Sequence, residues 1–175
     1  GAAVKLGRVV LVASNDLDVR FDFISALLSQ MEQSTRSVLI ESGGRLSPPT
    51  EQSIILTGHG EGIVSHALRM RPDYLIAADT CGVDTLAVVG AMGSSVNGGL
   101  IGVDAESPDD ALTRLTRQGS LSTSGDSDSV SAMMRDRIDI LVQLLAFSDG
   151  SFRVTQVMDV DGEMQETFSG FDGFN

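Results

Sequence analysis

The chain has little of what several classes of protein require. Of its 175 residues only 12 are Lys or Arg, against 24 Asp or Glu, so the formal net charge is −12. Because nucleic acids and anionic membrane surfaces are bound through clustered basic side chains, this balance argues against both as partners. The single cysteine, Cys81, excludes an internal disulfide and is typical of a reducing cytosol. No apolar run approaches the ~20 residues that a membrane-spanning helix needs, so no direct membrane insertion is expected.

What the sequence does contain is enough apolar material for one globular domain over residues 1–175, since hydrophobic residues make up 42%. The chain begins Gly-Ala-Ala without a signal peptide, and we interpret it as a domain taken from a longer protein. We expect an α/β core over 1–117, a flexible loop over 118–129 that is rich in Ser, Gly and Asp, and a helix followed by a β-meander over 130–175.

Apolar runs alternate between strand and helix patterns along the core. Strands are predicted at 8–14, 38–41, 54–57, 74–79 and 99–103, with helices at 18–33, 63–70, 83–92 and from 108 onward. This alternation predicts a three-layer α/β fold with a mostly parallel sheet and helices on both faces. Ligands of such sheets bind at the carboxyl ends of the strands, where Ser14, Glu41 and Asp79 fall. Two Asp-Gly pairs, at 149–150 and 161–162, predict antiparallel hairpins near the C-terminus.

The turn after the first strand has the setting of a phosphate-binding P-loop but not its chemistry. It reads Ser14, Asn15, Asp16, Leu17, Asp18, Val19, Arg20, Phe21. A P-loop needs glycines that let backbone N–H groups wrap the phosphates, a Lys for the phosphates and a Ser or Thr for Mg²⁺. Here the glycines are absent, Arg20 stands at the Lys position and Phe21 at the hydroxyl position. As structural elements, Asp16 or Asp18 would cap the helix and pair with Arg20, and Phe21 would join the apolar face.

Further along, an ordered series of motifs resembles the type II/type IV secretion and pilus ATPases, and within them the CpaF-like ATPases of Tad/Flp pilus assembly. The matching segments are RMRPD at 69–73, the strand that ends at Asp79, AM at 91–92, SPDDALTRL at 107–115, the run 139–143, DGS at 149–151 and RVT at 153–155. The resemblance implies a RecA-like P-loop NTPase fold, corresponding to the family's C-terminal domain.

This chain departs from that family where the family places its chemistry. Beside the P-loop, Arg45 stands where the family has a water-activating carboxylate, Asp79 replaces the Walker B Glu, Cys81 replaces an Arg, and Asp104 replaces a His. Leu56 likewise stands near the position of a family Arg. We therefore expect no catalytic residue, no bound cofactor and no metal, because phosphoryl transfer depends on positioning and on neutralising the phosphates.

The resemblance thus predicts a non-hydrolysing pseudo-ATPase. Such a subunit would be structural or regulatory, with an active secretion or pilus ATPase paralogue or an inner-membrane platform protein as its partner. It would form a homo- or hetero-oligomer, in the cytoplasm and peripheral to the inner membrane; a stand-alone adaptor is the opposing hypothesis. The alternative function is an atypical subunit that binds ATP and Mg through Arg20 and Asp79. A metal site built on His59 and His66 is the least favoured reading, because their spacing is not that of metal ligands.

Overall fold

The protein is described by a computed structural model that covers residues 2–58, 62–80, 85–121, 126–147 and 151–160, and the backbone of 165–169. Within these residues, eight strands form one sheet in the order β3-β2-β4-β5-β1-β6-β7-β8. The strands are β1 (Val9–Ala13), β2 (Ser37–Glu41), β3 (Ser53–Thr57), β4 (Tyr74–Ala77), β5 (Gly98–Val103), β6 (Ile140–Ala146), β7 (Phe152–Asp159) and β8 (Gln165–Ser169). The pairs from β3 to β6 are parallel, and β6–β7 and β7–β8 are antiparallel. The predicted mostly parallel sheet with an antiparallel C-terminal meander is confirmed.

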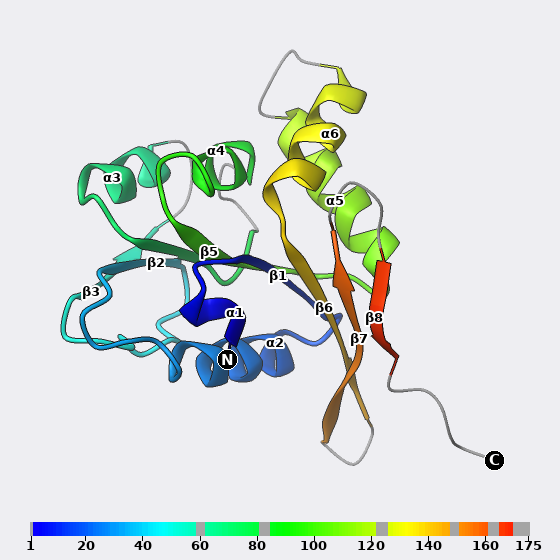
Figure 1. The fold of residues 1–175 in the computed structure, drawn as a ribbon, viewed down its shortest axis with the longest axis horizontal. Coiled ribbons are helices and arrows are strands. Elements are labelled where there is room, and N and C mark those ends of the chain that lie inside the picture. Colours follow the sequence, from blue (N-terminus) through cyan, green and yellow to red (C-terminus); the bar gives the residue numbers. More distant parts are fainter. Residues whose placement is uncertain are drawn as a thin grey trace.

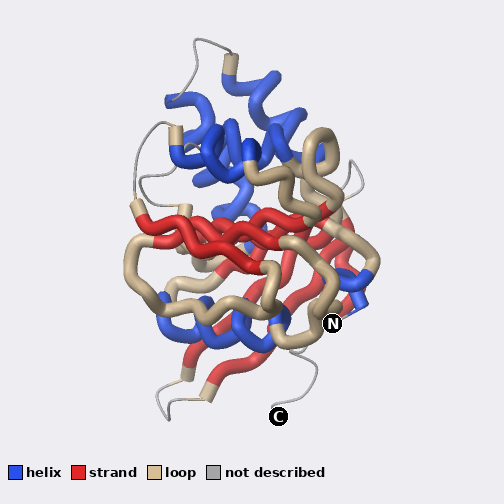
Figure 2. Tube along the Cα trace, turned by 90° about the vertical axis from the view of Figure 1, so that its left-hand side faces the viewer, coloured by secondary structure: helices blue, strands red, loops and turns tan. Residues whose placement is uncertain are grey.

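Helices cover both faces of the parallel part of the sheet, as the edge-on view in Figure 2 shows. They are α1 (Ala2–Lys5), α2 (Leu17–Leu28), α3 (Ile63–Arg69), α4 (Thr85–Ala91), α5 (Pro108–Leu121) and α6 (Ser127–Arg137). Alternate residues of each central strand enter two separate cores, because successive side chains of a strand point to opposite faces. Val10 and Val12 of β1 pack with α2, whereas Leu11 and Ala13 belong to the core under α3 to α6. Figure 1 shows α2 on one side of the parallel strands and α3 and α4 on the other.

The register of the central strands brings distant segments together at one edge of the sheet. Strand β1 lies between β5 and β6, and β5 lies between β1 and β4. Ala13 is opposite Val103, and Ala77 is opposite Ile101. The residues that follow these strands, Ser14, Asp79 and Asp104, therefore lie at the same carboxyl edge, where the sequence predicted a ligand site.

The predicted flexible loop over 118–129 is wrong at both ends. Helix α5 continues to Leu121 and α6 already begins at Ser127, so residues 118–121 and 127–129 are helical. Two interactions override the local composition. Gly119 lets α5 approach Val130 and Met134 of α6 closely, and Asp126 caps α6 by accepting a hydrogen bond from the Ser129 N–H at 2.8 Å. Helix α2, predicted over 18–33, spans Leu17–Leu28. The turns at 149–150 and 161–162 lie outside the described residues.

Tyr74, the only tyrosine of the chain, provides a test of the core. Its hydroxyl donates to the carbonyl oxygens of Arg8 and Gly99, at 2.9 and 3.1 Å, and burial raises the pKa of this phenol. Since an unfolded tyrosine ionises near pH ~10, the contribution of Tyr74 to stability is complete below that pH. It is lost as the pH rises further, because only the unfolded chain releases the proton easily.

We therefore expect the tyrosinate absorbance to rise only together with the loss of far-UV circular dichroism during an alkaline titration. A tyrosinate signal that develops near pH ~10 while the circular dichroism stays native would contradict the burial of this hydroxyl. Tyr74→Phe, which has no tyrosinate signal, is the control for the spectroscopic assignment.

Candidate functional site

The candidate site begins with the turn between β1 and α2, which is much shorter than a phosphate loop. Only Ser14, Asn15 and Asp16 separate Ala13 from the first helical residue, Leu17. The carboxylate of Asp16 caps the helix by accepting a hydrogen bond from the Val19 N–H at 3.0 Å, which confirms one of the two predicted caps. The backbone that would wrap a phosphate is thus helical, and one of its first N–H groups already donates to a carboxylate.

Arg20, at the Lys position, is buried inside the protein. Its side chain points from α2 to the carboxyl edge of the sheet, and only 2% of the residue is exposed. One guanidinium nitrogen, Nη1, donates to the Ser14 carbonyl oxygen at 2.8 Å, and Nη2 lies 3.9 Å from Oδ1 of Asp79. Burial lowers the pKa of Arg20, while the charges of Asp79, Asp104 and Asp16 oppose that shift. An arginine nevertheless stays protonated in proteins, so a fixed positive charge lies at this point.

The partner of Arg20 differs from the one that the sequence predicted. Arg20 forms its ion pair with Asp79, and neither Asp16 nor Asp18 is its partner. Asp18 instead pairs with Arg45 across the surface. Local spacing favoured Asp16 and Asp18, but the parallel register of β1, β5 and β4 brings the end of β4 over α2. Phe21 joins the apolar face of α2 as expected and is 7% exposed.

Arg45 is held against α2 and not against Asp79. Its guanidinium pairs with Asp18 and lies over the ring of Phe21, 5.4 Å from the ring centre. The buried carboxylate of Glu41 fixes the turn before it, because Oε2 accepts hydrogen bonds from the N–H groups of Arg45 and Leu46 at 3.0 and 3.1 Å. Glu41 and Arg45 therefore close the loop after β2 onto α2.

Arg20 and Asp79 line a cavity of about 340 Å³ at the carboxyl edge. Its other lining residues are Asn15, Leu17, Thr80, Asp104, Arg114 and Gln118. Asp104 lies 3.8 Å from Arg114, whose side chain also pairs with Asp110 at 2.9 Å. The Asp110 pKa is lowered by the hydrogen bond from the Glu106 N–H and by Arg114. The cavity thus contains two carboxylates and two guanidinium groups that already face one another.

Sequence reasoning missed Arg114 and Gln118, which α5 places in this cavity. Their spacing of one helical turn, following Asp110, is the signal that could have placed all three on one face of α5. Cys81 and His59 lie outside the described residues. Leu56 packs against the core beneath α3 and α4. Within the described parts of the chain, no three His, Cys, Asp or Glu side chains are grouped as a metal site.

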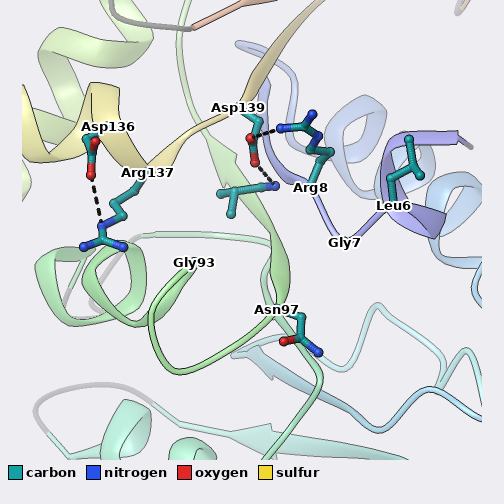
Figure 3. A pocket seen from close by; sticks show the side chains of 9 residues that line it. Leu6, Gly7, Arg8, Gly93, Asn97, Asp136, Arg137 and Asp139 are labelled. Atoms are coloured by element: carbon teal, nitrogen blue, oxygen red, sulfur yellow. Dashed lines mark hydrogen bonds and ion pairs between the residues drawn. The ribbon is translucent and has the colours of Figure 1, made fainter.

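A second cavity, of about 390 Å³, opens at the opposite edge of the sheet (Figure 3). There Asp139 accepts hydrogen bonds from Arg8 and from the Val9 N–H, both at 2.7 Å, and Asp136 lies 3.5 Å from Arg137. The contacts of Asp139 fasten the start of β1 to the segment between α6 and β6, and the Asp136–Arg137 pair lies within the last turn of α6, so we assign these contacts a structural role.

Comparisons with known proteins identify the fold. No protein-family model matches the sequence, and no curated protein matches it. Among solved structures, the VirB11 ATPase from the Brucella suis type IV secretion system, in complex with sulphate, superposes with a TM-score of 0.79 at 18% identity, over 91% of this chain and 52% of that one. The Legionella pneumophila ATPase DotB gives 0.60 at 12% identity, covering 89% and 46%. The pilus retraction motor PilT with bound ADP gives 0.56 at 14% identity, covering 93% and 48%.

The chain therefore has the RecA-like α/β fold of these secretion and pilus ATPases, and it spans about half the length of each of them. None of the helices in the described residues combines the length and the apolar character needed to cross a bilayer.

Proposed function

We propose that the protein is a pseudo-ATPase, a non-hydrolysing member of the secretion and pilus ATPase family of the CpaF-like kind. The main support is the ion pair of the buried Arg20 with the partly exposed Asp79, beside a helix capped by Asp16. In an active P-loop enzyme, free backbone N–H groups and a mobile Lys receive the phosphates. In this chain Arg20 is 2% exposed and already contacts the Ser14 carbonyl oxygen and Asp79. The carboxylate of Asp16 caps the first turn of α2.

The electrostatics of the turn support the same proposal. A triphosphate entering between α2 and β4 would meet the carboxylates of Asp16, Asp79 and Asp104, while Arg20 is held by Ser14 and Asp79. Phe21 supplies no hydroxyl for Mg²⁺ and is buried in the apolar core. Since phosphoryl transfer is catalysed by positioning and by neutralising phosphate charge, each of these features disfavours it.

The alternative function, an atypical ATP- and Mg-binding subunit, is supported by one observation, the cavity of about 340 Å³ that Arg20 and Asp79 line. It requires Arg20 to leave Ser14 and turn toward a phosphate, and Asp79 to exchange its guanidinium partner for a metal ion. Both steps must first break the contacts that the buried Arg20 makes with Ser14 and Asp79, which is unfavourable.

A subunit that does not hydrolyse ATP can still present the surface of a family subunit to its partners. We therefore propose a structural or regulatory role. The partner is an active secretion or pilus ATPase paralogue or an inner-membrane platform protein, and the place is the cytoplasmic side of the inner membrane. VirB11 and PilT, which share the fold, are described as a secretion-system ATPase and a retraction motor.

A partner experiment tests this role. Sedimentation of the chain, of an active paralogue from the same cell, and of their mixture should give a heavier species only in the mixture. The same comparison with the platform protein covers the second partner. A chain that stays monomeric and binds neither protein would sink the proposal of a machine subunit and leave the stand-alone adaptor.

A further inference from the structure

A groove between α5 and α6 is lined by two arginines, one from each helix. Arg117 on α5 and Arg135 on α6 line this cavity of about 450 Å³, with the buried side chain of Leu112 also in its lining. In the described part of the chain, neither guanidinium makes an ion pair or a hydrogen bond. The groove belongs to the helical layer and shares no lining residue with the cavity at Arg20.

Arg117 and Arg135 lie at nearly the same level along the helix axes, on opposite walls of the groove. Helices α5 and α6 are antiparallel neighbours (Figure 1), and Gly119 packs between Val130 and Met134. Arg117 precedes Gly119 by two residues, and Arg135 follows Met134 directly. At a rise of about 1.5 Å per residue, both positions lie about 3 to 5 Å from this contact, in the same direction along the groove.

The carboxylates of the groove lie at its two ends. Asp109 precedes Arg117 by eight residues on α5, which corresponds to about 12 Å along the axis. Asp128 precedes Arg135 by seven residues on α6, about 10 Å away in the opposite direction. Asp110, a nearby carboxylate outside the groove lining, accepts hydrogen bonds from the Glu106 N–H and from Arg114, and the charge of Arg117 adds only a smaller lowering of its pKa. The middle of the groove is therefore positive, and the hydroxyls of Thr113, Thr116 and Ser131 line it as well.

We propose that the middle of this groove binds the phosphoryl group of a single phosphate monoester. A phosphoryl group carries a charge of about −1.5 to −2 and three acceptor oxygens, so it can accept hydrogen bonds from two guanidinium groups and from neighbouring hydroxyls at once. A carboxylate has only two oxygens, and one guanidinium group pairs with both of them. Asp109 and Asp128 repel the flanking charges of an extended polyanion such as a nucleic acid. They therefore select a compact, isolated phosphoryl group.

Calorimetric titration of the whole chain with O-phosphoserine, and with a short phosphoserine peptide, tests this site at about 0.15 M salt, where long-range repulsion by the acidic protein is screened. We expect saturable binding that Arg117→Gln and Arg135→Gln each weaken about tenfold, because each removes charge-assisted hydrogen bonds. Tighter binding of the peptide identifies a protein-borne phosphate, and equal binding a free phosphate ester.

Arg69→Gln is the matched control, since Arg69 is an exposed arginine that ends α3 and lies in neither cavity. It should leave binding unchanged, and thermal melting should show that all three variants are folded. The proposal is overturned if neither phosphate compound binds saturably, or if Arg69→Gln weakens binding as much as the two groove variants.

Discussion

Gly102→Ala is expected to destabilise the protein by about 4 kcal/mol or more, the range reached when a substitution clashes with fixed backbone. A Cβ atom at this position on β5 would lie 2.0 Å from the carbonyl oxygen of Ala78 and 3.1 Å from Cδ of Arg20. The Ala78 oxygen cannot withdraw without moving the segment that carries Asp79, so the clash acts on the backbone and on the ion pair together. Thermal or urea unfolding followed by circular dichroism measures the loss.

Gly90→Ala is the matched control, because Gly90 lies inside α4 and a Cβ there would meet only the Met133 sulfur at 3.9 Å. This change should stabilise the protein by about 0.5 to 1 kcal/mol, the difference in helix propensity between the two residues. Equal stability of Gly102→Ala and the parent chain would show that the Ala78 carbonyl oxygen does not lie against Gly102 as described.

Arg20→Met is the second large effect, with an expected loss of about 3 kcal/mol. Methionine fills most of the volume of the side chain, so the loss comes from the charge: Ser14 loses its 2.8 Å hydrogen bond and Asp79 its buried counter-ion. Carboxylates that would otherwise be compensated by Arg20 then face one another at the carboxyl edge. Urea unfolding at neutral pH measures the change in free energy.

A double-mutant cycle separates charge from packing in this result. Asp79→Asn alone leaves Arg20 buried without its carboxylate, and combining it with Arg20→Met should recover about 1 kcal/mol or more relative to the sum of the single changes. The exposed Arg69→Met should change stability by no more than about 0.5 kcal/mol. Strict additivity of Arg20→Met and Asp79→Asn would mean that the two side chains do not interact.

Much of the fold could be predicted from the sequence because its strands are short, apolar and bounded by turn residues. Runs such as 9–13 and 74–77 are buried along their whole length, which is why continuous hydrophobicity identified them as strands of a mostly parallel sheet. The error at 118–129 has the opposite origin. Gly119 and the serines near it predict a loop locally, but close packing of Gly119 against Met134 supplies a tertiary contact that local composition does not contain.

The candidate site was only partly predictable for the same reason. The substitutions at Arg20, Phe21 and Arg45 can be read from the order of motifs, and the Asp16 cap follows from local chemistry. The ion pair between Arg20 and Asp79 joins residues of α2 and the end of β4, and strand order decides it. Arg114 and Gln118 reach the cavity through the packing of α5, which no motif records.

These contacts give the pseudo-ATPase proposal a physical content. Arg20 supplies a positive charge, Asp16 a helix cap and Phe21 an apolar side chain at the turn where a P-loop enzyme would bind phosphate. A ligand is not needed to compensate Arg20, and Asp79 already has a cationic partner. The proposed consequence is a subunit whose fold does not depend on nucleotide and whose role lies in its surface.

Calorimetric titration of the chain with Mg-ATP, together with a turnover assay, decides whether the protein is a pseudo-ATPase. We predict no binding in the micromolar range, no measurable hydrolysis, and the same result for Asp79→Ala. Micromolar binding of Mg-ATP, with turnover that disappears in Asp79→Ala, would contradict it and establish the atypical ATPase instead.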